Sequence, residues 1–157
     1  MQLSAVDVII IISHPILGSI VAYLLFKQWT SLKKIRIGTI DSEHLTRIRH
    51  QHQNNGRLLG NLVGATILLA IAVEAYRGMV LDVPLSELIS LHGWWGIILF
   101  MGAIGMRRTG TRISKEIQVG KDVGEQKRTH SKLGGAMMLL LVIIVFLGFL
   151  RLLQVLG

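Results

Sequence analysis

The stretch Leu133–Leu150 reads LGGAMMLLLVIIVFLGFL and contains no charged residue. At about 1.5 Å per residue, an α-helix of these 18 residues nearly covers the roughly 30 Å hydrocarbon core of a bilayer. The stretch therefore predicts a membrane-spanning helix.

Three other stretches have the same character, namely Ala5–Phe26, Leu58–Tyr76 and Leu85–Met106. Hydrophobic residues make up 51% of the 157, too many for a soluble fold of this size. Four spans joined by loops predict an all-α protein, an up-and-down bundle of four transmembrane helices. We expect residues 1–157 to form a single integral membrane domain that contacts membrane lipid.

The net charge of +8 is concentrated in two segments. Lys27–Arg57 and Arg107–Lys132 hold 15 of the 17 Lys and Arg residues. Positive-inside bias places both basic loops in the cytoplasm and both termini outside. The charge is thus a topology signal, and we expect no nucleic-acid partner.

The two basic segments differ in their predicted structure. In the first, Asp41 or Ser42 can cap a helix that continues through His52 into the second span, with Gly56 as a weak point. The second segment contains several glycines among its charges, and it predicts a polar excursion of about 25 residues between spans.

Four histidines are each followed four residues later by a glycine. The pairs are His14/Gly18, His52/Gly56, His92/Gly96 and His130/Gly134. Residues i and i+4 share one helix face, so each pair presents an imidazole beside bare backbone on which a flat ring can lie. This pattern predicts a tetrapyrrole held between helices. The alternative is that the glycines serve helix packing alone.

His14 and His92 are the sharpest candidates for metal ligands. Each lies about 10 Å from the outer end of its span, on the first and third helices, which face each other diagonally in a four-helix bundle. Two neutral imidazoles at one depth supply both axial positions of a haem iron. The alternative is that each ring hydrogen-bonds a neighbouring helix through Ser13, Ser19 or Ser90.

His52 and His130 form a second candidate pair of metal ligands, near the cytoplasmic surface. Both lie just outside the apolar runs of the second and fourth helices, and His50 is an alternative to His52. Solvated interfacial histidines are the competing interpretation. The chain has no cysteine, which excludes disulfides, iron–sulfur clusters and a covalently attached haem. Nucleotide-binding and hydrolase motifs are also missing, so no catalytic residue is named.

His14-Pro15, the lead into Gly56–Gly60, His92-Gly93 and His130–Gly134 resemble segments of the four-helix membrane cytochrome b superfamily. The resemblance is to small cyanobacterial and plastid membrane proteins of unknown function, which are distantly similar to ascorbate- and ferric-reductase cytochromes. It implies an outer haem b on His14 and His92, and a second, inner haem on His130 with His52 or His50. The second span departs from the His-x-Arg/Lys-Leu-Gly pattern by having Gly56 at the histidine position.

The expected function is electron transfer through a haem b with two histidine ligands, in a prokaryotic inner or thylakoid membrane. Any enzyme activity would be that of an electron-transfer cytochrome, with redox or photosynthetic membrane proteins as partners. One alternative is a chlorophyll-associated accessory or assembly subunit of a photosynthetic complex, because imidazole also suits chlorophyll magnesium. Another is a purely structural membrane subunit.

Overall fold

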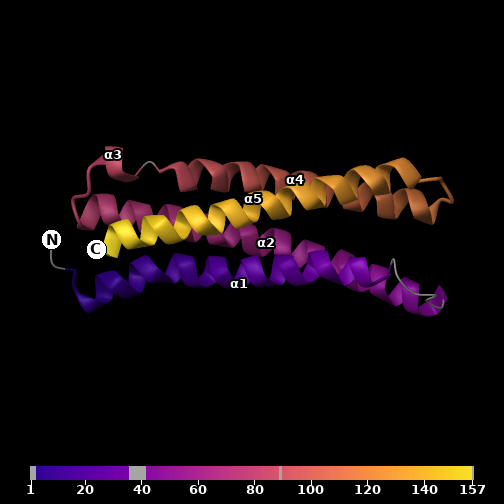
Figure 1. Cartoon of the computed structure of the whole chain (residues 1–157), viewed down its shortest axis with the longest axis horizontal. Helices are drawn as coiled ribbons and strands as arrows, with labels where there is room; N and C mark the ends of the chain where they lie inside the picture. Colours follow the sequence, from indigo (N-terminus) through magenta and orange to yellow (C-terminus); the bar gives the residue numbers. More distant parts are fainter. Residues whose placement is uncertain (1–2, 36–41, 89, 157) are drawn as a thin grey trace.

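The structure is a computed structural model that describes residues 3–35, 42–88 and 90–156, and Figure 1 shows its helices side by side. The helices are α1 (Ala5–Ile35), α2 (Ser42–Val80), α3 (Leu85–Leu88), α4 (Leu91–Gln118) and α5 (Gly124–Leu156). α1 packs against α2 and α5, and α4 packs against the same two helices. The four long helices therefore form a square in which α1 faces α4, and α2 faces α5, across the diagonals.

Among the described residues, three helices are long and apolar enough to cross a membrane, through Ala5–Thr30, Thr46–Val80 and Gly124–Leu156. The span predicted over Leu85–Met106 is interrupted: α3 ends at Leu88 and α4 begins at Leu91. Ser90 caps α4, its hydroxyl oxygen accepting from the Gly93 N–H at 3.2 Å. The continuous apolar part of α4, Leu91–Met106, is thus about 24 Å long.

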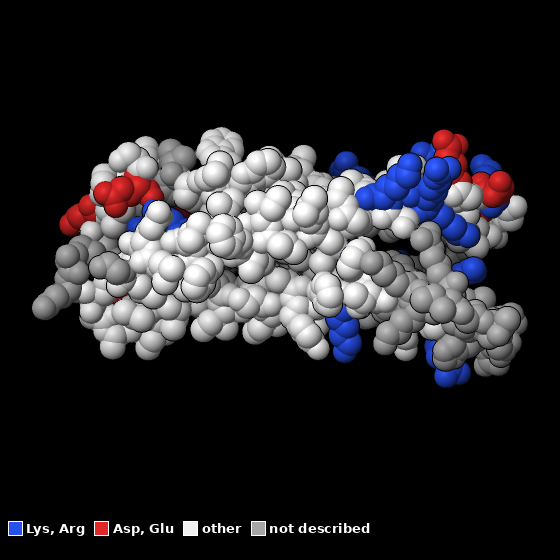
Figure 2. Space-filling model, in the orientation of Figure 1, with Lys and Arg blue, Asp and Glu red and all other residues white. Residues whose placement is uncertain are grey.

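The surface is apolar along the middle of the bundle and charged at its ends. Figure 2 shows this uncharged belt, with most of the Lys and Arg side chains at the end opposite the chain termini. Large apolar side chains such as Ile9, Leu68 and Val142 are exposed on the belt, whereas Ile11, Val63 and Ile144 are buried. Helices that are apolar on all sides suit a lipid environment.

The predicted polar excursion of the second basic segment is wrong. α4 continues past Met106 as far as Gln118, and only residues 119–123 connect it to α5. Arg and Lys are good helix formers, and Arg112 pairs with Glu116 four residues later at 2.8 Å. The charges therefore extend the helix instead of ending it.

The first basic segment agrees with its prediction in the described part. α2 begins at Ser42 and runs through His52 and Gly56 without a break. The capping role predicted for Asp41 or Ser42 is not tested, because Asp41 and the side chain of Ser42 lie outside what the structure describes.

The start of α1 and the end of α2 are joined by side chains. Ser4 and Asp7 form a reciprocal capping box at the start of α1, with each side chain accepting from the other's backbone N–H. The Tyr76 hydroxyl of α2 donates to the second Asp7 oxygen at 2.5 Å. Beside it, the buried Arg77 forms an ion pair with Glu74 at 2.7 Å.

Candidate metal centre between diagonal histidines

His14 of α1 and His92 of α4 meet across the diagonal of the bundle. Their ring centroids are 6.0 Å apart, and the ring planes make an angle of 66°. The two side chains are half-buried and come from helices that do not otherwise pack against each other. The predicted pairing of these two histidines is therefore present in the structure.

Each of these rings is oriented by a backbone carbonyl of a neighbouring helix. His14 Nδ1 lies 3.2 Å from the Thr66 oxygen of α2, and His92 Nδ1 lies 3.0 Å from the Ile144 oxygen of α5. A carbonyl only accepts, so both Nδ1 atoms must carry the hydrogen. In the neutral imidazole this leaves the Nε2 lone pair of each ring available to a metal.

The histidines contact these carbonyls and not the serine side chains that the sequence offered as alternative partners. The hydroxyls of Ser13 and Ser19 donate to carbonyls of their own helix, at 2.6 and 2.8 Å. Ser90 is occupied in capping α4. The histidines thus contact neighbouring helices through main-chain atoms, which no side-chain pattern reveals.

The glycines around the outer pair have different surroundings. A Cβ on Gly18 would contact the Thr66 methyl at 3.9 Å, while Gly96 has no heavy atom within 4 Å of that position. The tightest position is Gly148 of α5, where a Cβ would lie 2.8 Å from His92 Cε1. Glycine is therefore required at 148 for the ring to reach its carbonyl.

His52 of α2 and His130 of α5 are both half-buried and lie towards the basic end of the bundle. His130 Nδ1 lies 3.0 Å from the Thr109 hydroxyl, whose own hydrogen goes to the carbonyls of Gly105 and Met106. The hydroxyl accepts from Nδ1, so the His130 Nε2 lone pair is also available.

His52 is held in the opposite tautomer. The Gln28 amide nitrogen donates to His52 Nδ1 at 2.6 Å and to the His52 carbonyl at 2.8 Å. An Nδ1 that accepts leaves the hydrogen on Nε2, so this ring offers no outward lone pair unless Gln28 turns. The inner pair is therefore less suited to a metal than the outer pair.

The remaining predicted residues at the inner end are placed as follows. Gly56 has open space at its Cβ position, and Gly134 faces the Met106 methyl at 3.4 Å. His50, the alternative ligand, is exposed. At Gly110, which was not predicted, an added Cβ would lie 3.4 Å from His130 Cε1, so that ring lies close to α4.

The site residues that sequence reasoning missed, Thr66 and Ile144, occupy equivalent positions in the two hairpins α1–α2 and α4–α5. Each outer histidine and the residue whose carbonyl it contacts are separated by the same interval of 52 positions along the chain. The step from His52 to His130 equals the step from His14 to His92. This repeated spacing indicates that the two hairpins are equivalent, but it does not by itself single out residues 66 and 144.

Two arginines, Arg77 near the end of α2 and Arg151 near the end of α5, lie in the half of the bundle that holds His14 and His92. Arg77 is neutralised by Glu74, whereas Arg151 of α5 donates from one terminal nitrogen to the Glu87 carbonyl. Arg151 Nε is buried without a hydrogen-bond partner, and Glu74 and Arg151 both act electrostatically on His92. Arg151 is thus a cation with one N–H group that has no acceptor.

Within residues 3–35, 42–88 and 90–156, no three His, Cys, Asp or Glu side chains are grouped to hold a metal ion. Each diagonal pair offers two imidazoles at most. No protein-family model, curated protein or solved structure matches the chain.

Proposed function

We propose that this protein is a membrane cytochrome in which His14 and His92 are the axial ligands of one haem b. The observation that carries the proposal is the pair of imidazoles whose centroids are 6.0 Å apart, each with its Nδ1 hydrogen donated to a carbonyl. Metal-bound histidines nearly always donate their other ring nitrogen in this way, which orients the ring and raises its basicity.

The separation of the two rings supports the same assignment. A metal–imidazole bond is about 2 Å long and a ring nitrogen lies about 1 Å from its centroid, so rings on opposite sides of one metal are about 6 Å apart. The observed centroid distance is 6.0 Å. The four equatorial ligands that two histidines cannot supply are those of a macrocycle, and chlorophyll would need only one of the two rings.

Charge at the outer site also suits a haem. The unpartnered Arg151 Nε is available to a carboxylate of the macrocycle, and Gly96 leaves bare helix surface beside His92. The bound group would supply one-electron redox chemistry. The protein would hold the iron through both axial positions and leave none for oxygen or a substrate, so electron transfer is the proposed activity.

We place all four long helices across the membrane, with both termini outside and the basic segments in the cytoplasm. The short apolar part of α4 is extended by Arg107 and Arg108, whose stems can lie along the hydrocarbon while the guanidinium groups reach the surface. The membrane is a prokaryotic inner or thylakoid membrane in this proposal.

The proposal includes a second haem at His52 and His130 only if the Gln28 side chain rearranges. The Gln28 amide must turn so that its oxygen accepts from His52 Nδ1. The outer site needs no such change, so it is the site that is filled first.

The test is the optical spectrum of the full-length protein purified from membranes. We expect reduced-minus-oxidised bands of a low-spin haem, which His14→Ala and His92→Ala each abolish or convert to a high-spin form. His50→Ala is the matched control, because that side chain is exposed, and it should leave the spectrum unchanged.

Three results would contradict the proposal. A red absorption band would identify the chlorophyll-binding alternative, and a colourless protein after haem supplementation would leave a structural role. A low-spin haem that survives both outer substitutions would move the site away from His14 and His92.

A further inference from the structure

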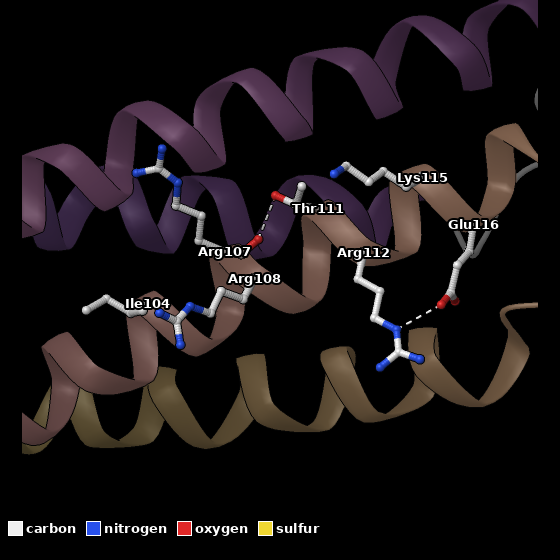
Figure 3. A pocket seen from close by; sticks show the side chains of 7 residues that line it. All are labelled: Ile104, Arg107, Arg108, Thr111, Arg112, Lys115 and Glu116. Carbon is white, nitrogen blue, oxygen red and sulfur yellow. Dashed lines mark hydrogen bonds and ion pairs between the residues drawn. The ribbon is translucent and has the colours of Figure 1, made fainter.

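A groove of about 700 Å³ lies along the cytoplasmic part of α4, and its lining is strongly basic. Figure 3 shows Arg107, Arg108, Arg112 and Lys115 extending from successive turns of this helix. The only carboxylate in the lining is Glu116, which is paired with Arg112 at 2.8 Å. The groove therefore carries a net positive charge of three.

Three of the four cations in this groove are not neutralised by a carboxylate of any described residue. Arg107 donates to the Asn61 side chain of α2 at 3.0 Å, a contact that leaves its charge uncompensated. Arg108 and Lys115 form no hydrogen bond or ion pair with any described residue. The Thr111 hydroxyl lies between them but is donated to the Arg107 carbonyl at 2.9 Å, so the free donors are those of the cations (Figure 3). An anion with several acceptor oxygens fits this set of donors.

A second groove of about 390 Å³ shares Ile104 and Arg107 with the first and continues between α2 and α4. Its other lining residues are almost all apolar or small: Gly60, Asn61, Gly64, Ala65, Leu68, Phe100 and Ala103. From residue 60 to residue 68 it follows α2 for about 12 Å. Leu68 is 69% exposed, so this groove opens towards the surroundings of the apolar belt.

The junction of the two grooves coincides with the end of the apolar part of α4. Arg107 directly follows Met106, the last residue of that run, so it lies where a bilayer changes from hydrocarbon to headgroups. Gly60 and Gly64 lack side chains there, and Cβ atoms on them would contact Arg107 and Phe100 at 3.8 and 3.6 Å. An occupant must be anionic on one side of this boundary and apolar on the other.

We propose that the joined grooves bind an anionic phospholipid of the membrane. The phosphate contacts Arg107, Arg108 and Lys115, and one acyl chain follows the groove between α2 and α4. Basic pockets at the cytoplasmic ends of transmembrane helices recognise such headgroups in general. This site is separate from the histidine pairs, so it does not depend on the proposed haem.

The experiment is native mass spectrometry of the full-length protein in detergent, titrated with phosphatidylglycerol, phosphatidylcholine and glycerol phosphate. We expect phosphatidylglycerol to bind more tightly than phosphatidylcholine. One cation near the headgroup contributes about fivefold, so Arg107→Ala with Arg108→Ala should weaken binding roughly 30-fold. The matched control is Lys127→Ala with Arg128→Ala, which removes the same charge from exposed positions of α5 outside the groove.

A second variant tests the acyl chain. Ala65→Phe fills the apolar groove from an exposed position, and circular dichroism can verify that the helices remain folded. It should weaken phospholipid binding at unchanged charge. Equal binding of both phospholipids, or equal losses in both charge variants, would overturn the proposal. So would competition by glycerol phosphate as strong as by the lipid, or indifference to Ala65→Phe.

Discussion

The His92 imidazole lies against a bare part of α5, because Gly148 has no side chain to keep the ring away. Its Cε1 and Nδ1 atoms are 2.8 and 3.1 Å from the point where a Cβ would be. The same approach brings Nδ1 to the Ile144 carbonyl. One missing methyl group on α5 thus sets the orientation of a ring on α4.

At the scale of residues, Gly148→Ala should destabilise the protein by about 1–3 kcal/mol, because the new methyl overlaps the His92 ring, which must then move away from the Ile144 carbonyl. Thermal unfolding followed by circular dichroism measures the effect. The matched control is Gly135→Ala on the same helix, where no heavy atom lies within 4 Å, and it should be neutral or stabilising. Equal melting temperatures for both variants would contradict the assigned contact.

The extension of α4 beyond its apolar part is the element that shapes the basic end. It carries Thr109 to His130, and it places Ser114 where the Gln53 amide of α2 donates to it at 2.9 Å. It also carries the four cations of the basic groove. The helix ends in a Schellman motif, in which the N–H of Gly120 bonds to Ile117 and the N–H of Lys121 bonds to Glu116.

At the scale of elements, Gly120→Ala should cost about 1 kcal/mol, because residue 120 has a φ of 73° that only glycine adopts without penalty. Gly120→Asn should lose less stability than Gly120→Ala, since asparagine tolerates this conformation. Chemical unfolding of the three proteins compares their stabilities. Gly105→Ala, in open space inside α4, is the control that should gain stability, and a gain for Gly120→Ala would contradict this ending of the helix.

The whole molecule is two similar hairpins that run in the same direction along the bundle. The interval from His52 to Thr66 on α2 equals the interval from His130 to Ile144 on α5. The two histidine levels are therefore about 21 Å apart on both helices, which is nearly four helical turns and keeps both levels on the same face of each helix. Two ligand pairs at this separation would lie near opposite surfaces of one membrane.

At the scale of the whole molecule, the orientation in the membrane is tested with single cysteines, since the chain has none of its own. Ser86→Cys should react with an impermeant maleimide in intact cells. Thr129→Cys should react only after the membrane is opened, because the proposed orientation, which follows positive-inside bias, places the basic end in the cytoplasm. Both side chains are on exposed residues. The reverse pattern of labelling would invert the proposed topology.

The amino-acid sequence by itself determined the class of fold and the candidate ligands. Uncharged stretches such as Leu133–Leu150 have no soluble alternative, and imidazoles among them are few enough to single out. Helix periodicity and depth were sufficient to pair His14 with His92. Both ends of α4 were predicted wrongly. The helix begins later than the apolar stretch because Ser90 caps it, and it continues past the stretch, where Arg112 and Glu116 form an i,i+4 ion pair.

Only the tertiary structure decided which ring nitrogens are available. The tautomers of His14 and His92 depend on carbonyls of Thr66 and Ile144, and every residue has a carbonyl, so no residue type marks these two. The tautomer of His52 depends on Gln28 of α1. Main-chain partners and ring tautomers are set by how the helices pack, which is the information that a linear pattern of side chains does not contain.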